Sequence, residues 1–250
     1  MKVFNYLLDT AKRRGGGYLI LIDPDTRIDD SLQDFVKEAC SKGVDALLVG
    51  GSLIMDAGFQ KCLTKVKEVS SVPVIIFPGS LKQISSEADA ILFISLISGR
   101  NPYYLFGDHV IAAPLVRKLG IEPISTGYML IESGKRTTAE FMSDTIPLPV
   151  HKPEIAMAHA LAAQYMGMQQ VYLEAGSGAD RSVPAELVKA VCDFIDIPVI
   201  TGGGIRKPED ARAKVEAGST FIVTGNVLDN SDNMHMIEEF ARAVHRREKM

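Results

Sequence analysis

Two acidic residues, Asp23 and Glu174, each end a short apolar run and are the side chains best suited to chemistry. Asp23 stands in the motif Leu-Ile-Asp-Pro-Asp at 21–25. A carboxylate beside a bound phosphate is a typical Mg²⁺ ligand, because Mg²⁺ prefers oxygen ligands and bridges phosphate oxygens. Asp25 is the other candidate at this point, or it caps the next helix. The motif also fits a simple turn and helix cap.

Glu174 stands in Val-Tyr-Leu-Glu-Ala-Gly-Ser-Gly at 171–178. Strand alternation places Tyr172 and Glu174 on the same side of a strand, so both are catalytic candidates, and Glu174 is positioned to act as a general base. The loop Gly-Ser-Gly then offers backbone and hydroxyl donors. A glutamate used only for packing is the alternative, and it is costly without partners. In Val-Gly-Gly-Ser at 49–52, Ser52 is either a second metal ligand or a helix N-cap.

Two glycine-ended segments near the C-terminus indicate a phosphate site. They read Val-Ile-Thr-Gly-Gly-Gly-Ile at 199–205 and Phe-Ile-Val-Thr-Gly-Asn at 221–226. In a (β/α)₈ barrel, the loops after strands 7 and 8 bind phosphate through backbone N–H groups. Glycine is needed there because a Cβ would block the approach of the phosphate. The pair therefore predicts both a barrel and a phosphate-bearing ligand.

Short, continuously apolar runs recur along the whole chain, as expected for strands covered on both faces. They lie at 18–22, 46–49, 74–77, 90–94, 122–126 (or 122–131), 170–173, 198–201 and 220–223. Eight such runs, separated by helical patterns, predict an α/β protein of the (β/α)₈ TIM-barrel class. We expect one catalytic domain over residues 1–250.

Amphipathic helix signals separate most of these runs. Helices are predicted from an Asp30-Ser31 cap to Cys40, over 185–194 with Pro184 in the first turn, over 211–217 after Pro208 and before Gly218, and over 233–247. One unit differs: only 80–86 lies between strands three and four, so the third helix is predicted to be reduced or missing. The segment 131–150 is too long for an ordinary loop and is functional or interface-forming.

Composition excludes several classes of protein. The chain has 250 residues, 46% hydrophobic and 23% charged, with a net charge of −4, so no nucleic-acid partner is expected. The three scattered cysteines indicate buried free thiols in a reducing compartment. The N-terminus carries no signal-peptide pattern, and no apolar run reaches membrane-spanning length. The sequence therefore predicts a soluble, cytoplasmic protein.

The motifs described above, taken in order, resemble those of the geranylgeranylglyceryl phosphate synthase family. The same resemblance includes Phe-Pro-Gly at 77–79 and Ser-Gly-Arg-Asn-Pro at 98–102. It covers nearly the whole chain, and the strand Tyr-Leu-Glu-Ala-Gly-Ser-Gly at 172–178 is its most specific part. The smaller branch of this family has a lysine two residues before the metal aspartate. Leu21 occupies that position here, as in the branch that often forms larger assemblies.

The resemblance implies a modified TIM barrel that uses Mg²⁺. It implies transfer of a prenyl group from a prenyl diphosphate to the sn-3 hydroxyl of sn-glycerol 1-phosphate, which is the first ether-forming step of archaeal-type lipid synthesis. Geranylgeranyl diphosphate is the expected donor. By matching position, Asp23 and Ser52 would hold the metal. The residues that would hold glycerol 1-phosphate are Tyr172, Leu173, Glu174, Ala175, Gly176, Ser177, Gly178, Gly203, Gly204, Gly225 and Asn226.

The prenyl tail requires an apolar groove. Its candidate lining residues are Leu53, Ile54, Phe93, Ile97, Tyr103, Tyr104 and Phe106, which fit core or interface positions equally well. We expect a homo-oligomer, either a dimer or a hexamer, with residues 131–150 and 103–106 as interface surfaces. Product release would involve transient contact with a membrane.

Two other functions remain open from the residues alone. A phosphosugar isomerase of the histidine or tryptophan pathway type would share the phosphate loops after strands 7 and 8. A phosphate-ligand sensor would share the fold but would need neither an inward glutamate nor a metal aspartate. A requirement for Mg²⁺ and a prenyl diphosphate distinguishes these functions.

Overall fold

Eight parallel strands close into a barrel in which each strand pairs with the next and β8 pairs with β1. The structure, a computed structural model, describes residues 2–26, 31–55, 58–228 and 233–247. The strands are β1 (Gly17–Ile22), β2 (Ala46–Val49), β3 (Val74–Ile76), β4 (Ala90–Leu96), β5 (Glu122–Leu130), β6 (Gln170–Glu174), β7 (Val199–Gly202) and β8 (Phe221–Thr224). The predicted (β/α)₈ class is confirmed.

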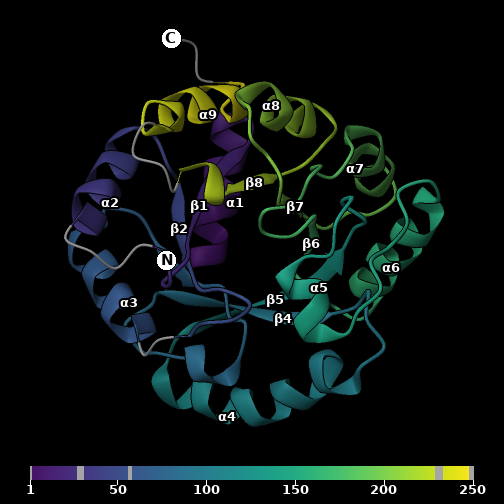
Figure 1. Cartoon of the computed structure of the whole chain (residues 1–250), viewed down its shortest axis with the longest axis horizontal. Helices are drawn as coiled ribbons and strands as arrows, with labels where there is room; N and C mark the ends of the chain where they lie inside the picture. Colours follow the sequence, from purple (N-terminus) through teal and green to yellow (C-terminus); the bar gives the residue numbers. More distant parts are fainter. Residues whose placement is uncertain (1, 27–30, 56–57, 229–232, 248–250) are drawn as a thin grey trace.

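Helices form a ring around the barrel in Figure 1. They are α2 (Ser31–Ser41), α3 (Gly58–Val69), α4 (Asp108–Leu119), α6 (Pro153–Tyr165), α7 (Ala185–Cys192), α8 (Pro208–Glu216) and α9 (Met236–Val244), whereas the short helix α5 (Thr138–Ser143) lies inside this ring. Shorter helical turns among the described residues include η1 (Leu81–Gln83), η2 (Tyr103–Gly107) and η3 (Asn226–Leu228). Pro184 is the N-cap of α7 rather than a residue of its first turn, and Asp30 lies outside the described residues.

The third unit of the barrel has no full helix, as predicted. Between β3 and β4 the chain forms only the three-residue turn η1. The segment 131–150 contains the short helix α5, and an isolated bridge pairs Ile131 with Leu148. These two segments depart from a regular barrel, and each follows the carboxyl end of a strand, β3 or β5. Both therefore shape the barrel mouth.

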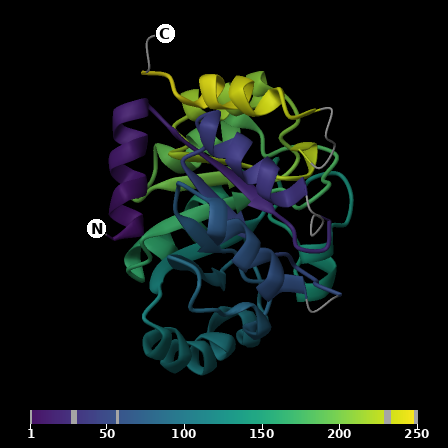
Figure 2. The same cartoon turned by 90° about the vertical axis from the view of Figure 1, so that its left-hand side faces the viewer.

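Helix α1 (Val3–Arg14) lies across one end of the barrel (Figure 2). Its apolar residues Phe4, Leu7 and Ala11 pack against side chains inside the barrel. The Glu122 carboxylate at the start of β5 accepts hydrogen bonds from the first N–H groups of α1. This contact pairs N–H groups that a helix cannot pair internally. It also places a negative charge at the helix N-terminus, where the helix dipole favours it. The amino end of the barrel is therefore closed, and ligands must enter at the carboxyl end.

The packing agrees with strands buried on both faces. Alternate residues point inward and outward, so Tyr18 of β1 stacks on Phe240 of α9, whereas Leu19 packs inside the barrel. All three cysteines are free thiols; Cys62 is buried, as expected, but Cys40 and Cys192 are partly exposed. Within the described ranges, no helix is long and apolar enough to cross a membrane.

Candidate active site at the carboxyl end of the barrel

A cavity of about 930 Å³ opens at the carboxyl ends of the strands. Its lining comes from the ends of most strands, so residues far apart in sequence share one space. Asp23, Ser52, Tyr172, Glu174, Ser177, Gly178, Gly203, Gly204 and Gly225 all line it. The structure thus brings together candidates that the sequence could only assign to separate strand ends.

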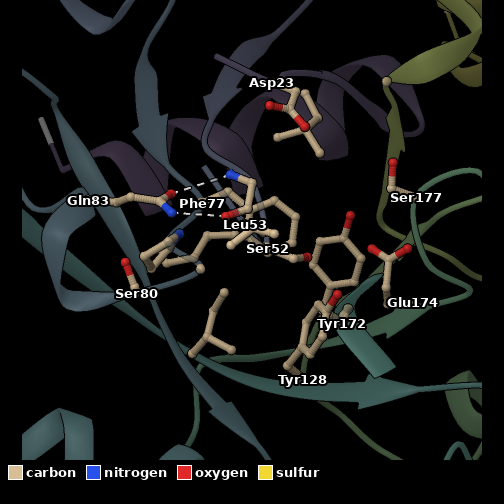
Figure 3. A pocket seen from close by; sticks show the side chains of 18 of the residues that line it. Asp23, Ser52, Leu53, Phe77, Ser80, Gln83, Tyr128, Tyr172, Glu174 and Ser177 are labelled. Carbon is tan, nitrogen blue, oxygen red and sulfur yellow. Dashed lines mark hydrogen bonds between the residues drawn. The ribbon is translucent and has the colours of Figure 1, made fainter. Parts of the chain in front are cut away.

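Glu174 is the last residue of β6 and is only 5% exposed. Its Oε1 accepts the Gly176 N–H at 2.6 Å, and the hydroxyls of Tyr172 and Tyr128 donate to the same carboxylate. Burial raises the pKa of Glu174 to about 7, although these hydrogen bonds act in the opposite direction. Figure 3 shows the two tyrosine rings beside the glutamate. A carboxylate with this pKa is suited to accept a proton near neutral pH.

The glycines at the end of β7 leave room for the Tyr172 and Glu174 side chains. A Cβ on Gly202 would lie 2.2 Å from the Tyr172 hydroxyl, and one on Gly203 would lie 2.2 Å from Glu174 Oε1. Gly203 and Gly204 also have positive φ angles of 78° and 66°. Side chains are therefore excluded here by the neighbouring protein atoms as well as by the backbone conformation.

Gly225 and Gly178 are glycines of a different kind. A Cβ on Gly225 would meet nothing closer than 3.5 Å, and one on Gly178 would meet no atom within 4 Å. Both residues line the cavity, so the space beside them faces the ligand site. Asn226 follows Gly225 as the first residue of η3, but its side chain lies outside the described residues.

Asp23 lies after β1, on the cavity wall. Its Oδ1 accepts the Asp25 N–H at 3.0 Å, and Gly51 approaches so closely that a Cβ there would lie 3.2 Å from Oδ2. Asp25 instead accepts the Met55 N–H at 2.8 Å, which joins the loops after β1 and β2. Ser52 precedes the start of α3 at Gly58 by too far to be its N-cap.

The apolar part of the cavity lies between β3, β4 and α4, next to η1. Of the proposed groove residues, Leu53, Ile54, Phe93 and Tyr104 line it. The other three do not line it and instead fit the core or interface alternative: Ile97 packs on the cluster around β5 and β6, whereas Tyr103 and Phe106 are exposed. Because no full helix follows β3, this space is not filled by a helix as it would be in a regular barrel.

Sequence reasoning missed Tyr128, His109 and Gln83. Tyr128 stands opposite Tyr172 in the β5–β6 register, and the predicted extension of β5 was the signal that could have found it. His109 of α4 lines the apolar part, with its ring 4.7 Å from that of Phe93, and burial lowers its pKa. Gln83 of η1 lies in a segment whose sequence shows no periodicity.

The two histidines His151 and His159, eight residues apart, do not share a helix face. His151 precedes the first residue of α6, and His159 Nδ1 contacts the Ile155 carbonyl at 2.7 Å. Among the described residues, no cluster of three or more His, Cys, Asp or Glu side chains could hold a metal by itself. A metal at Asp23 would therefore need oxygen ligands of other kinds, such as hydroxyl, backbone, water or substrate oxygens.

A closed barrel whose mouth combines glycine-lined loops with a deep apolar cavity belongs to the class of phosphate-binding (β/α)₈ enzymes. The chain belongs to the PcrB family, whose model matches residues 8–244. This agrees with the family that the motifs indicate.

Curated relatives carry a more specific name. A geranylgeranylglyceryl phosphate synthase from Chitinophaga pinensis is 39% identical, with 98% of this chain and 96% of the relative covered. One from Thermococcus kodakarensis is 42% identical, with the same coverage. The solved structure of the Thermoplasma acidophilum synthase, in complex with sn-glycerol-1-phosphate, is 35% identical with a TM-score of 0.92 over 98% of this chain and 99% of that one. The protein is a prenyltransferase of this family.

Proposed function

We propose that the protein joins a prenyl diphosphate, geranylgeranyl diphosphate in particular, to the sn-3 hydroxyl of sn-glycerol 1-phosphate. The hydroxyl oxygen forms a bond to the allylic carbon, the bond from that carbon to diphosphate breaks, and the hydroxyl proton is accepted by the protein. The observation that carries this proposal is the buried Glu174, which lies at the cavity wall between two tyrosine hydroxyls and the glycine loops.

Glu174 acts as the general base in this proposal. A positioned base must lie within hydrogen-bond reach of the proton it accepts, and its pKa should lie near the working pH. Both conditions agree with a carboxylate that lines the cavity and has a pKa of about 7. Tyr172 and Tyr128 orient the carboxylate, because their hydroxyls donate to it.

The acceptor phosphate lies against the loops after β6, β7 and β8. Gly176, Ser177 and Gly178 follow β6, Gly203 and Gly204 follow β7, and Gly225 and Asn226 follow β8. The open space at Gly178 and Gly225 supports this assignment, since a phosphate can approach the backbone there. Leu173 and Ala175 complete the strand end. Fixing the acceptor this way makes bond formation effectively intramolecular.

Mg²⁺ fits the other part of the site. Asp23 supplies a carboxylate and Ser52 a hydroxyl, and a metal that keeps waters and binds substrate phosphates needs few protein ligands. When bound, Mg²⁺ would neutralise the charge on the diphosphate as it leaves. The apolar groove beside η1 would then hold the hydrocarbon chain, which extends away from the diphosphate.

We also propose that the chain, a single catalytic domain over residues 1–250, forms a homo-oligomer. Large apolar side chains are exposed on η2, α4 and the segment 131–150, including Phe106, Ile111, Phe141 and Ile146. Exposed apolar side chains gathered on neighbouring elements are typical of protein or membrane contacts. A membrane contact through these side chains would be transient and would serve product release.

The test is a product assay with the purified protein. C15, C20 and C35 prenyl diphosphates are offered separately with radiolabelled sn-glycerol 1-phosphate and Mg²⁺. We expect an ether product, with the C20 donor giving the highest kcat/KM. Absence of product with every donor would refute the proposal, and a C35 preference would refute the assignment of the donor.

A further inference from the structure

The short segment that replaces the third helix is tied to the loop after β2 by one side chain. Gln83 of η1 donates from Nε2 to the Gly51 carbonyl at 2.9 Å, and its Oε1 accepts the Gly51 N–H at 3.3 Å (Figure 3). Gln83 is only 3% exposed. Both polar atoms of its amide are thus used on a single residue of the neighbouring loop.

The backbone on either side of Gly51 is packed against the same segment. A Cβ on Gly50 would lie 1.9 Å from the Phe77 carbonyl oxygen. A Cβ on Gly79 would lie 2.1 Å from the Gly51 carbonyl oxygen and 2.9 Å from Ser52 Cα. These approaches allow only glycine, so the loop and the segment after β3 form one closely packed unit.

The opposite side of Gly51 faces Asp23. A Cβ at Gly51 would lie 3.2–3.3 Å from the carboxylate atoms of Asp23. Gly51 therefore lies between Gln83 on one side and Asp23 on the other, and Ser52 is the next residue. Any shift of the Gly51 peptide would move Ser52 relative to Asp23.

We propose that Gln83 is a positioning residue for the metal and diphosphate part of the site. It holds the Gly51 peptide so that Ser52 and Asp23 keep the separation at which both would hold one cation. This inference rests on the proposed function, because it takes Asp23 and Ser52 as the metal ligands. The segment that replaces the third helix would then help to position the metal ligands.

The physical reason is the need to pair backbone polar groups. A loop at a barrel mouth has few backbone partners, and an unpaired N–H or C=O favours another conformation in which water can reach it. Gln83 satisfies both groups of Gly51 with a side chain whose position is fixed by burial. Residues that orient metal ligands typically change metal affinity by about 10–100-fold when they are removed.

The experiment measures metal binding directly. Mn²⁺, a spectroscopic substitute for Mg²⁺, is titrated into the full-length protein with inorganic diphosphate, and free Mn²⁺ is followed by electron paramagnetic resonance. Binding of sn-glycerol 1-phosphate is measured separately by calorimetry. The variants are Gln83→Met, which has a similar shape but cannot bond Gly51, and Gln83→Asn, which keeps the amide but has a shorter reach.

A matched control is Gln164→Met. Gln164 of α6 also uses both amide atoms on one residue, donating to Asp196 Oδ2 at 3.0 Å and accepting the Asp196 N–H at 2.7 Å, but it does not line the cavity. We expect both Gln83 variants to weaken Mn²⁺ binding by about tenfold or more. Acceptor binding should change less than about twofold in them, and the control should change neither quantity.

The Asp23→Asn variant separates failure of the Gln83 positioning role from failure of the metal site itself. If it weakens Mn²⁺ binding and both Gln83 variants bind as the natural protein does, Gln83 has no positioning role but the metal site stands. If Asp23→Asn also leaves Mn²⁺ binding unchanged, the metal site itself is misassigned. Equal loss of Mn²⁺ and acceptor binding in both Gln83 variants would overturn the positioning role too, since the defect would then be general.

Discussion

At the residue scale, the chemistry depends on a carboxylate that is buried yet fully hydrogen-bonded. Burying a charged group without partners is costly, and the cost appears as a raised pKa. Glu174 keeps part of its acidity because Gly176, Tyr172 and Tyr128 donate to it. The balance of burial and hydrogen bonding therefore sets the base strength near neutral pH.

Replacing this carboxylate should separate binding from turnover. We expect Glu174→Gln to lower kcat by about 10²–10⁴-fold, because the amide cannot accept the proton. Affinity for sn-glycerol 1-phosphate, measured by calorimetry, should change little, since the glycine loops remain. Glu216→Gln, at an exposed position on α8, is the control. Near-normal turnover in Glu174→Gln would remove Glu174 from the base role.

The pKa of Glu174 also predicts a pH profile. The carboxylate is the active form, so kcat/KM should rise with pH and level off above about pH 7. Tyr128→Phe removes a hydrogen bond that lowers the Glu174 pKa, so its profile should be displaced to higher pH. Because the acceptor phosphate also titrates near pH 6 in both proteins, the difference between the two profiles is the relevant measurement. Identical profiles would contradict this account.

At the element scale, the loops after the strands divide into two kinds. Gly202 and Gly203 are required because Tyr172 and Glu174 occupy the space that a side chain would take. Gly225 and Gly178 face open space instead. Gly178 still has a positive φ of 69°, so a side chain there would strain the backbone, whereas Gly225 has no positive φ and can be substituted without disturbing the protein itself.

Gly225→Ala tests the phosphate loop after β8. An added Cβ would meet no atom closer than 3.5 Å, and Gly225 does not have a positive φ. The free energy of unfolding should therefore stay unchanged. A methyl group facing the phosphate should weaken acceptor binding by about tenfold or more, equivalent to about 1.4 kcal/mol. Gly107→Ala is the control, because its closest contact is also ordinary at 3.4 Å and it lies outside the cavity lining. Unchanged acceptor affinity would move the phosphate site away from Gly225.

At the scale of the whole molecule, a buried ionic group at the amino end of the barrel joins segments from both ends of the chain. Asp45, just before β2, is 2% exposed and accepts the Tyr18 N–H at 2.8 Å. It also contacts Arg14 of α1 at 2.6 Å and His245, which follows α9, at 2.9 Å. One carboxylate therefore connects the first helix, the first strand and the C-terminal region.

Asp45→Ala should lower the free energy of unfolding without changing kcat. Removing one partner of a buried ionic group costs about 3–5 kcal/mol, because the remaining charged groups lose the carboxylate that compensates their burial. Urea denaturation measures the loss. Asp193→Ala removes an exposed pair with Lys189 and should cost less than about 1 kcal/mol. A similar small effect at Asp45, or a large loss of kcat, would contradict this assignment.

Much of this architecture follows from local sequence. The predicted strands are found with their ends displaced by a few residues, and the shortened third unit is confirmed. These features depend on runs of apolar residues, on glycines and on the length of a connection, all of which lie within one stretch of chain. Three of the seven groove candidates do not line the cavity, because the pattern does not tell which side of a turn or helix faces it.

The sequence by itself determined the barrel, the positions of the candidate side chains at strand ends and the family. Only the tertiary structure decided which of these groups meet. Tyr128 reaches Glu174 because the β5–β6 register places it opposite Tyr172, and Gln83 reaches Gly51 because a short turn lies against the loop after β2. Both contacts join segments that are distant along the chain. Barrel closure sets such distances, whereas the local preferences that a sequence pattern records do not.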